Sequence, residues 1–447
     1  MSKTKDMTVG NPTQLILSFG LPLLAGNILQ QLYNMVDTIV VGRGVGVDAL
    51  AAVGATGSFN FLVLGFLMGM AQGVSILVAQ FFGSKDYRRL RQSITMSAYL
   101  SIVVCGILTV LSILFTKDIL LLMDTPENII DDAVTYITII FACMFISYLY
   151  NFFSGILRAV GDSKNPVIAM VIAFFVNVVL DVWFVMGIHM GVAGAAYATV
   201  IAQAVSTVYC FIAYMRIKEC RVQKEDWQMN VSLIKESFLI SIPVAIMNSI
   251  TAVGIMVLQA GVNHFGTTYV AAYSAGGKIV IILEQIGSTF GYACSTYVGQ
   301  NLGARKPNRI RKGVNQTAVV MVVVHILLGI VMLIISKPIL AMMIGKSETI
   351  VIAQAYQYLK WNYIFIFVLS ILWIYRCSLQ SLGDTVLPMV SGIVEFFSRL
   401  ICTMVLPSII GFDGIAFSEV AAWTFACCVL IPAFYYRLHQ QESKYSS

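Results

Sequence analysis

Residues 80–91 read QFFGSKDYRRLR, and residues 300–311 read QNLGARKPNRIR. One glutamine, one glycine and two arginines occupy the same offsets in the two stretches, which lie about 220 residues apart. Both stretches follow long apolar segments, so the motif marks the same loop in two copies of one membrane unit. A duplicated unit of this size is typical of transporters, in which one half moves against the other.

Further matched residues extend the repeat over most of the chain. Pro22 and Asn27 correspond to Pro243 and Asn248 with the same spacing. The other matched positions are Gly46 with Gly266, Gly161-Asp162 with Gly383-Asp384, and Gly191 with Gly414. Each half contains an even number of predicted spans, so both halves enter the membrane from the same side and the repeat is parallel.

Composition predicts the fold class. Hydrophobic residues make up 58% of the chain and charged residues 11%, against about 25% charged in soluble domains. Stretches of about 20 apolar residues can span a bilayer as helices. Twelve such stretches cover residues 13–41, 48–76, 92–116, 130–156, 164–188, 192–217, 233–262, 268–297, 312–336, 350–378, 385–409 and 414–436. Strand-type alternation is absent, which favours helices over a barrel.

We therefore predict an all-α polytopic membrane protein. Its twelve transmembrane helices form two six-helix lobes related by a parallel pseudo-two-fold repeat. The N-terminal lobe is expected at residues 1–216, a cytoplasmic linker at 217–232, and the C-terminal lobe at 233–447.

The distribution of charge predicts the orientation in the membrane. The formal net charge is +6, and most basic residues fall in the loops after the second, fourth, sixth, eighth and twelfth spans. The loop between the third and fourth spans is acidic instead. The positive-inside rule then places both termini in the cytoplasm, and we expect the plasma membrane as the location. These basic loops determine topology and give no sign of a nucleic-acid partner.

Aspartates inside predicted spans are the strongest functional signal, because ionisable groups at membrane depth are costly. Tyr33 and Asp37 are four residues apart in the first span, and Asn177 and Asp181 are four apart in the fifth. The second half lacks such an acid: Asp37 aligns with Leu258. We interpret the two aspartates as a proton or Na⁺ site. The alternative is a structural role at aqueous helix ends.

The first span carries two further features. Pro22 removes a backbone hydrogen bond, so it marks either a bend point or a static kink. Tyr33 and Asn34 lie farther along the same span and are candidates for lining a substrate cleft.

The second half contains its own charged residues. Glu284 in the eighth span is a candidate for contacting a cationic substrate, unless Lys278 or Arg376 neutralises it. Glu395 and Arg399 are four residues apart on one helix face, which predicts a structural ion pair.

Together these residues resemble the MATE (multidrug and toxic compound extrusion) family. The resemblance rests on QQLYNMVD at residues 30–37 after Pro22, on the paired loops, and on RAVGD at residues 158–162. It implies a secondary antiporter that expels lipophilic organic cations in exchange for H⁺ or Na⁺, with no cofactor. It also implies a V-shaped cleft between the lobes.

Within the family the chain resembles the DinF-like branch most. That branch implies a cation-coupling site in the N-terminal lobe and a bend at Pro22. The matching coupling positions are Asp37, Asn177, Asp181, Tyr136 and Thr199. The first three of these residues could also hold Na⁺. The seventh span lacks the acid of the NorM-like branch and has Gln259 there. Coupling through the N-terminal lobe is therefore favoured, and the choice between H⁺ and Na⁺ stays open.

Three functional classes fit a duplicated membrane protein. The leading prediction is a multidrug antiporter, expected to be a monomer whose partners are small organic cations and the bilayer. The alternative is a flippase for a lipid-linked precursor, which would need a cleft rich in arginine and lysine. A membrane enzyme would need a nucleophile or histidine site, but His325 is alone in its span, so we expect no enzyme.

Overall fold

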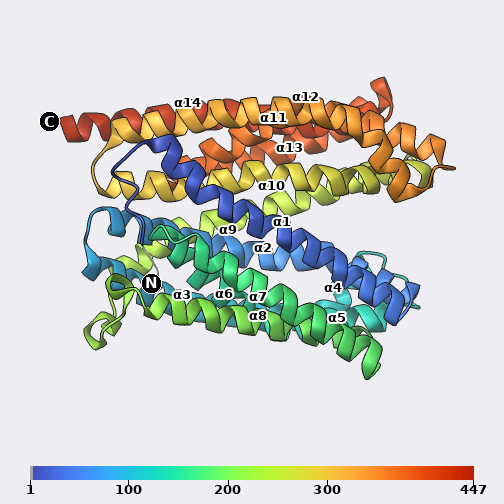
Figure 1. The fold of residues 1–447 in the computed structure, drawn as a ribbon, viewed down its shortest axis with the longest axis horizontal. Helices are drawn as coiled ribbons and strands as arrows, with labels where there is room; N and C mark the ends of the chain where they lie inside the picture. Colours follow the sequence, from blue (N-terminus) through green and yellow to red (C-terminus); the bar gives the residue numbers. More distant parts are fainter. Residues whose placement is uncertain (1–3, 447) are drawn as a thin grey trace. The chain divides into compact units, whose positions relative to one another are not determined.

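The computed structural model describes residues 4–446, and within them the protein is helical and contains no strand (Figure 1). Residues 1–3 and 447, the ends of the two predicted lobes, lie outside this range. The long helices are α1 (Pro12–Gly44), α2 (Val47–Gly83), α3 (Tyr87–Leu114), α5 (Ile130–Ala142), α6 (Met144–Ala159), α7 (Lys164–Asp181), α8 (Gly191–Met215), α9 (Val231–Asn263), α10 (Thr267–Gly303), α11 (Pro307–Ile344), α12 (Thr349–Ser381), α13 (Val386–Ile410) and α14 (Asp413–Ser446). The short elements are α4 (Thr116–Leu122), η1 (Val182–Gly187), η2 (Lys218–Cys220) and η3 (Lys224–Trp227).

The predicted all-α membrane fold is confirmed. Among residues 4–446, ten helices are long and apolar enough to cross a membrane, and the bent pair α5 and α6 makes an eleventh span. Helix α10 occupies the position of the predicted eighth span and is 37 residues long. Helix α10 carries two charged side chains, Lys278 and Glu284, within this length.

The predicted fourth span is bent, where a continuous helix was expected. Helices α5 and α6 meet at an angle of 47°. Between them Cys143 leaves the helical region, with φ −108° and ψ 11°. Its amide N–H still donates to the carbonyl of Ile139 at 3.3 Å. No proline causes this break, so the usual sequence signal for a kink is missing here.

The internal repeat is visible in the backbone of its turns. Lys85 and Arg305 occupy the same position of the repeated loop, and their φ angles are 59° and 57°. Gly161 and Gly383 also correspond, with φ angles of 86° and 90°. A positive φ is uncommon for a residue other than glycine. The matched left-handed residues therefore extend the sequence repeat to the conformation of the chain.

The chain divides into two compact units. Unit 1 contains Leu21–Ala245 and the described residues up to Asp6, and unit 2 contains Met7–Gly20 and the chain from Ile246 onward. Helices α1 and α9 are therefore each divided between the units, close to Pro22 and Pro243 respectively. The lobe boundaries expected at residues 216 and 233 remain predictions, since the compact units divide inside helices.

Unit 1 is built on α2, which packs against α3, α5 and α6, while α7 packs against α8. The first part of α9 approaches α2 closely at Gly69 and Gly73. A Cβ atom at Gly69 would lie 2.6 Å from the Cα atom of Ala245, and Gly73 faces Ser241 in the same way. Small residues at these positions allow close backbone packing, as in many membrane helix pairs.

In unit 2, α10 packs against α12, and α13 lies beside α14 (Figure 1). The second copy of the repeated motif binds the segment that precedes α1. The Met7 amide donates to Gln300 Oε1 at 2.8 Å, and Asn301 Nδ2 donates to the Met7 carbonyl at 3.1 Å. Arg309 Nη1 donates to the Gly10 carbonyl at 3.0 Å. The motif thus has a structural role in this copy.

The first copy of the motif binds the linker between the halves. Arg91 Nε lies 2.7 Å from Asp226 Oδ2 in η3, and Thr95 Oγ1 donates to the Asp226 carbonyl at 2.7 Å. Burial, together with the charge of the adjacent Glu219, raises the pKa of the Cys220 thiol in this linker to about 12. The thiol is therefore protonated at neutral pH and weakly reactive.

Candidate functional site

The carboxyl groups of Asp37 and Asp181 meet inside unit 1. Asp37 lies on α1 and Asp181 is the last residue of α7, and their side chains interact directly. One oxygen of Asp37 and both oxygens of Asp181 are buried and accept no hydrogen bond from the described residues. No ion pair within residues 4–446 includes either aspartate. Two ionised carboxylates in contact repel each other, so the pair requires a shared proton or a bound cation.

The end of α7 sets the position of Asp181. The helix changes there to the π-helical turn Val182–Gly187, a wide turn of the kind that often occurs at functional sites. Asn177 lies one turn earlier on the same face and is fully buried. Neither its amide nitrogen nor its amide oxygen has a hydrogen-bond partner in the described part of the chain. Its oxygen could therefore join the two carboxylates as a neutral ligand of a monovalent cation.

Two tyrosines and a threonine surround the carboxyl pair. The Tyr33 hydroxyl on α1 donates to Thr199 Oγ1 on α8 at 3.3 Å. Tyr136 on α5 is 8% exposed, and its hydroxyl interacts electrostatically with both Asp37 and Asp181. Four helices, α1, α5, α7 and α8, thus contribute to one polar cluster.

Not every predicted residue belongs to this cluster. The five predicted coupling positions and Tyr33 come together, although their roles remain predictions. Asn34 is exposed on α1, and its carbonyl accepts a hydrogen bond from Thr38 Oγ1 at 2.7 Å. Pro22 lies inside α1, next to the boundary of the compact units. Glu284 belongs to unit 2 and takes no part in the cluster.

The buried acid Glu395 of unit 2 has two basic partners. Glu395 Oε2 lies 2.6 Å from Arg376 Nη2, and its Oε1 lies 3.0 Å from Arg399 Nη2. All three side chains are at most 5% exposed. The predicted pair of Glu395 and Arg399 is confirmed. The pairing of Arg376 with Glu395 instead of Glu284 was missed, because residues on different helices give no local spacing signal.

The structure gives Glu284 other neighbours than Lys278 and Arg376, the two bases considered from the sequence. Lys278 is exposed, and Glu284 interacts with Glu419 of α14 and with Arg399. The Tyr358 hydroxyl donates to Glu419 Oε2 at 3.0 Å. Glu419 was not predicted as a site residue, since it lies alone among apolar residues of the last span.

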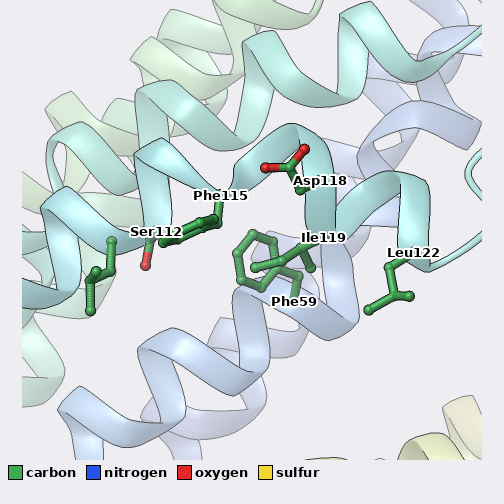
Figure 2. A pocket seen from close by; sticks show the side chains of 7 residues that line it. Phe59, Ser112, Phe115, Asp118, Ile119 and Leu122 are labelled. Carbon is green, nitrogen blue, oxygen red and sulfur yellow. The ribbon is translucent and has the colours of Figure 1, made fainter.

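A separate cavity lies in unit 1 between α2, α3 and α4 (Figure 2). Its volume is about 290 Å³, and Phe59, Phe115 and Ile119 form much of its wall. Asp118 is its one charged lining residue. The cavity contains none of the predicted site residues, and apart from Ser112 and Asp118 its lining is apolar.

The sequence of this chain is similar to that of known membrane transport proteins. A sequence model of the MatE family matches residues 22–183 and again residues 243–405. The two matches reproduce the internal repeat. "Probable multidrug resistance protein YoeA" of Bacillus subtilis (strain 168) is 29% identical over 356 residues, which cover 77% of this chain and 77% of that protein.

Two further matches concern the branch and the fold. "DNA damage-inducible protein F" of Escherichia coli (strain K12) is 27% identical over 361 residues, covering 77% of this chain and 75% of that protein. A solved structure described as "MATE in the bent conformation" has a TM-score of 0.90 at 20% identity and covers 100% of both chains. At that identity the structural match establishes the fold.

Proposed function

This chain belongs to the MatE family, and from that premise we propose that it is a secondary active multidrug exporter. It exchanges lipophilic organic cations for H⁺ or Na⁺ by alternating access. The similarity to YoeA, whose name describes a probable multidrug resistance protein, supports this substrate class. MATE proteins are transporters and not enzymes, so the polar cluster of unit 1 is a binding site and no residue is assigned a catalytic role.

The observation that carries the proposal is the carboxyl pair of Asp37 and Asp181, which lacks a basic partner among the described residues. A membrane protein that buries two acids together gains little stability from them. A site that binds and releases a cation needs such groups, because their charge is compensated only when the cation is bound. The oxygens of Asn177, Asp37 and Asp181 suit either a proton or Na⁺.

In the proposed exchange, H⁺ or Na⁺ neutralises the charge of the two aspartates and so drives release of the organic cation. When H⁺ or Na⁺ enters from outside, the repulsion between Asp37 and Asp181 disappears and α1 can move closer to α7. Pro22 lacks a backbone N–H, so α1 can bend there at lower cost than at other positions. The similarity to a MATE protein solved in a bent conformation supports this step. This bend releases the organic cation on the outer side.

The proposed location is the plasma membrane, with both termini in the cytoplasm. The protein is proposed to act as a monomer. The clustering of basic residues in the loops after even-numbered spans supports this orientation. A flippase for a lipid-linked precursor gains no support. Its phosphate groups would need free arginines, whereas Arg376 and Arg399 already bind Glu395.

Reconstituted transport tests the proposal. Purified protein in liposomes is given ethidium, a fluorescent lipophilic cation, under a proton gradient and, separately, under a Na⁺ gradient. We expect one of these gradients to drive ethidium movement. The Asp37→Asn variant should lose this movement while retaining normal expression and a monodisperse elution profile, because the neutral amide does not take up a proton and gives Na⁺ no negative charge to bind.

Asp118→Asn is the matched control, since Asp118 is an exposed aspartate of unit 1 outside the cluster. It should transport ethidium at the wild-type rate. Movement that responds to neither gradient in the wild-type protein would exclude an antiporter for this substrate class. Full activity of Asp37→Asn would remove Asp37 from the coupling step.

A further inference from the structure

A basic cavity lies in unit 2 where α10 ends and α11 begins. Its volume is about 310 Å³, and it is lined by the second copy of the repeated motif and by the end of α14. The lining residues are Arg305, Lys306, Pro307, Asn308, Arg309, Glu442 and Tyr445. Glu442 is the acid among them, and it already binds Arg311 at 2.7 Å. The three bases of the lining therefore give the cavity a positive charge.

The bases of this cavity bind neutral groups. Lys306 Nζ and Arg309 Nη1 donate to backbone carbonyls of the segment before α1, at 2.9 Å and 3.0 Å. Arg305 lies over the ring of Tyr445, with 5.8 Å between its Cζ atom and the ring centroid. No ion pair within residues 4–446 includes any of these three bases. Their charge is thus held in place without an acidic partner, which suits an anionic ligand.

The first copy of the motif has an acid where the second has a base. Asp86 corresponds to Lys306, and its Oδ1 accepts from the Arg89 amide at the start of α3. The start of α11 has no such side-chain cap, because the lysine ammonium has no acceptor oxygen. The same backbone turn thus carries its own carboxylate in one copy and a base in the other. An anion in the cavity would supply the negative charge that the second copy lacks.

The surface beside the cavity favours a phospholipid as the source of this anion. The cavity lies at the start of α11, a helix apolar enough to span the membrane, and basic pockets at such helix ends attract anionic lipid heads. Asn308 of the cavity is exposed on α11. Val319 and Val323 lie farther along the same helix face and are 64% and 50% exposed. An acyl chain can follow this apolar face while its phosphate group lies among the bases.

We propose that this cavity binds the phosphate group of an anionic phospholipid, such as phosphatidylglycerol, through Arg305, Lys306 and Arg309. The binding rests on the membrane fold of the chain and not on the proposed exchange. Lys306 and Arg309 also hold the segment before α1. A bound lipid should therefore stabilise the attachment of that segment to unit 2.

Native mass spectrometry of the full-length protein, freed of lipid in detergent, measures this binding. Phosphatidylglycerol and phosphatidylcholine of equal chain length are titrated separately, and we expect tighter binding of phosphatidylglycerol. Arg305→Gln/Lys306→Gln should weaken that binding about 30-fold, since each base near a lipid head contributes a factor of about five. The matched control Lys85→Gln/Arg88→Gln removes two exposed charges from the first copy of the motif. It should change the affinity by less than about twofold.

A second variant separates binding from folding. Asn308→Glu leaves the hydrogen bonds of the bases in place and adds a negative charge to the cavity. It should weaken the binding of phosphatidylglycerol without lowering the melting temperature of the lipid-free protein. Unchanged affinity in this variant and in Arg305→Gln/Lys306→Gln would overturn the site.

Two further outcomes would also contradict the proposal. Equal weakening by the double variants of both motif copies would show a general attraction of basic loops to anionic lipid. Full displacement of the lipid by an equal concentration of inorganic phosphate would assign the cavity to a free anion. None of these readouts depends on export, so a failure of ethidium transport would leave them intact.

Discussion

Glu395 of unit 2 accepts hydrogen bonds from two arginines, whereas Asp37 and Asp181 of unit 1 form no ion pair within residues 4–446. Both groups lie on membrane-spanning helices of the same duplicated framework. The basic partners in unit 2 fix the charge of Glu395 permanently. Under the proposed function, a mobile cation compensates the charge of the carboxyl pair in unit 1. A repeated helical framework thus holds buried acids in two different charge environments, with arginine partners in unit 2 and without an ion-pair partner among the described residues in unit 1.

Loss of an arginine should have the largest effect on stability. In Arg376→Met, Glu395 keeps one partner but loses the other, and a half-broken buried ion pair costs about 3–5 kcal/mol. Because Arg399 remains in place, we expect a loss of about 3 kcal/mol in the free energy of unfolding. Unfolding by sodium dodecyl sulphate in mixed micelles, followed by tryptophan fluorescence or circular dichroism, measures this value.

The triple variant Arg376→Met/Glu395→Leu/Arg399→Leu is the control for that prediction. An apolar replacement of a whole buried ionic group is often neutral or stabilising, so much of the lost stability should return. Equal destabilisation of the single and triple variants would mean that the side chains matter here for packing and not for charge.

In unit 1 the removal of an acid should act in the opposite direction. Asp181→Asn deletes one of two carboxyl groups in contact and leaves an isosteric amide beside Asn177. Relief of the repulsion should raise the free energy of unfolding by about 1 kcal/mol at neutral pH. The same unfolding measurement at acidic pH provides the check, since a protonated pair has no repulsion to relieve. A loss of stability at both pH values would show that Asp181 is a structural acid like Glu395.

The sequence predicted the helical scaffold well because the repeated motifs contain the residues that form its turns. The left-handed turns at Lys85 and Arg305 and at Gly161 and Gly383 follow the repeated motifs directly. Each predicted span has a helix. The bend at Cys143 escaped prediction because no proline or glycine marks it, and the backbone there responds to tertiary packing.

The candidate sites show a similar division between local and distant signals. Spacing on one helix was enough to pair Asn177 with Asp181 and Glu395 with Arg399. Contacts between helices, such as Arg376 with Glu395 or Tyr358 with Glu419, have no counterpart in spacing. The pairing of Asp37 with Asp181 was predicted from their matching positions in two spans, whereas Tyr136 and Thr199 were added by resemblance to a family, which carries three-dimensional information that a single chain lacks.

The smallest expected effect concerns the hydrogen bond between Tyr33 and Thr199, which has no counterpart around Glu395. Tyr33→Phe removes the hydroxyl that donates to Thr199 Oγ1 at 3.3 Å. A single hydrogen bond of this kind contributes about 0.5–1.5 kcal/mol, and its length places it at the lower end. A double-mutant cycle with Thr199→Val isolates the pair from other contacts of either side chain. If the hydroxyl only joins α1 to α8, the coupling energy should be the same at acidic and neutral pH. If the phenol also donates toward the carboxyl pair when the proton leaves, the cost of Tyr33→Phe should grow at neutral pH, while Thr199→Val alone stays constant. That second result would include Tyr33 among the groups that respond to the charge of Asp37 and Asp181, and an invariant cycle would assign it to helix packing alone.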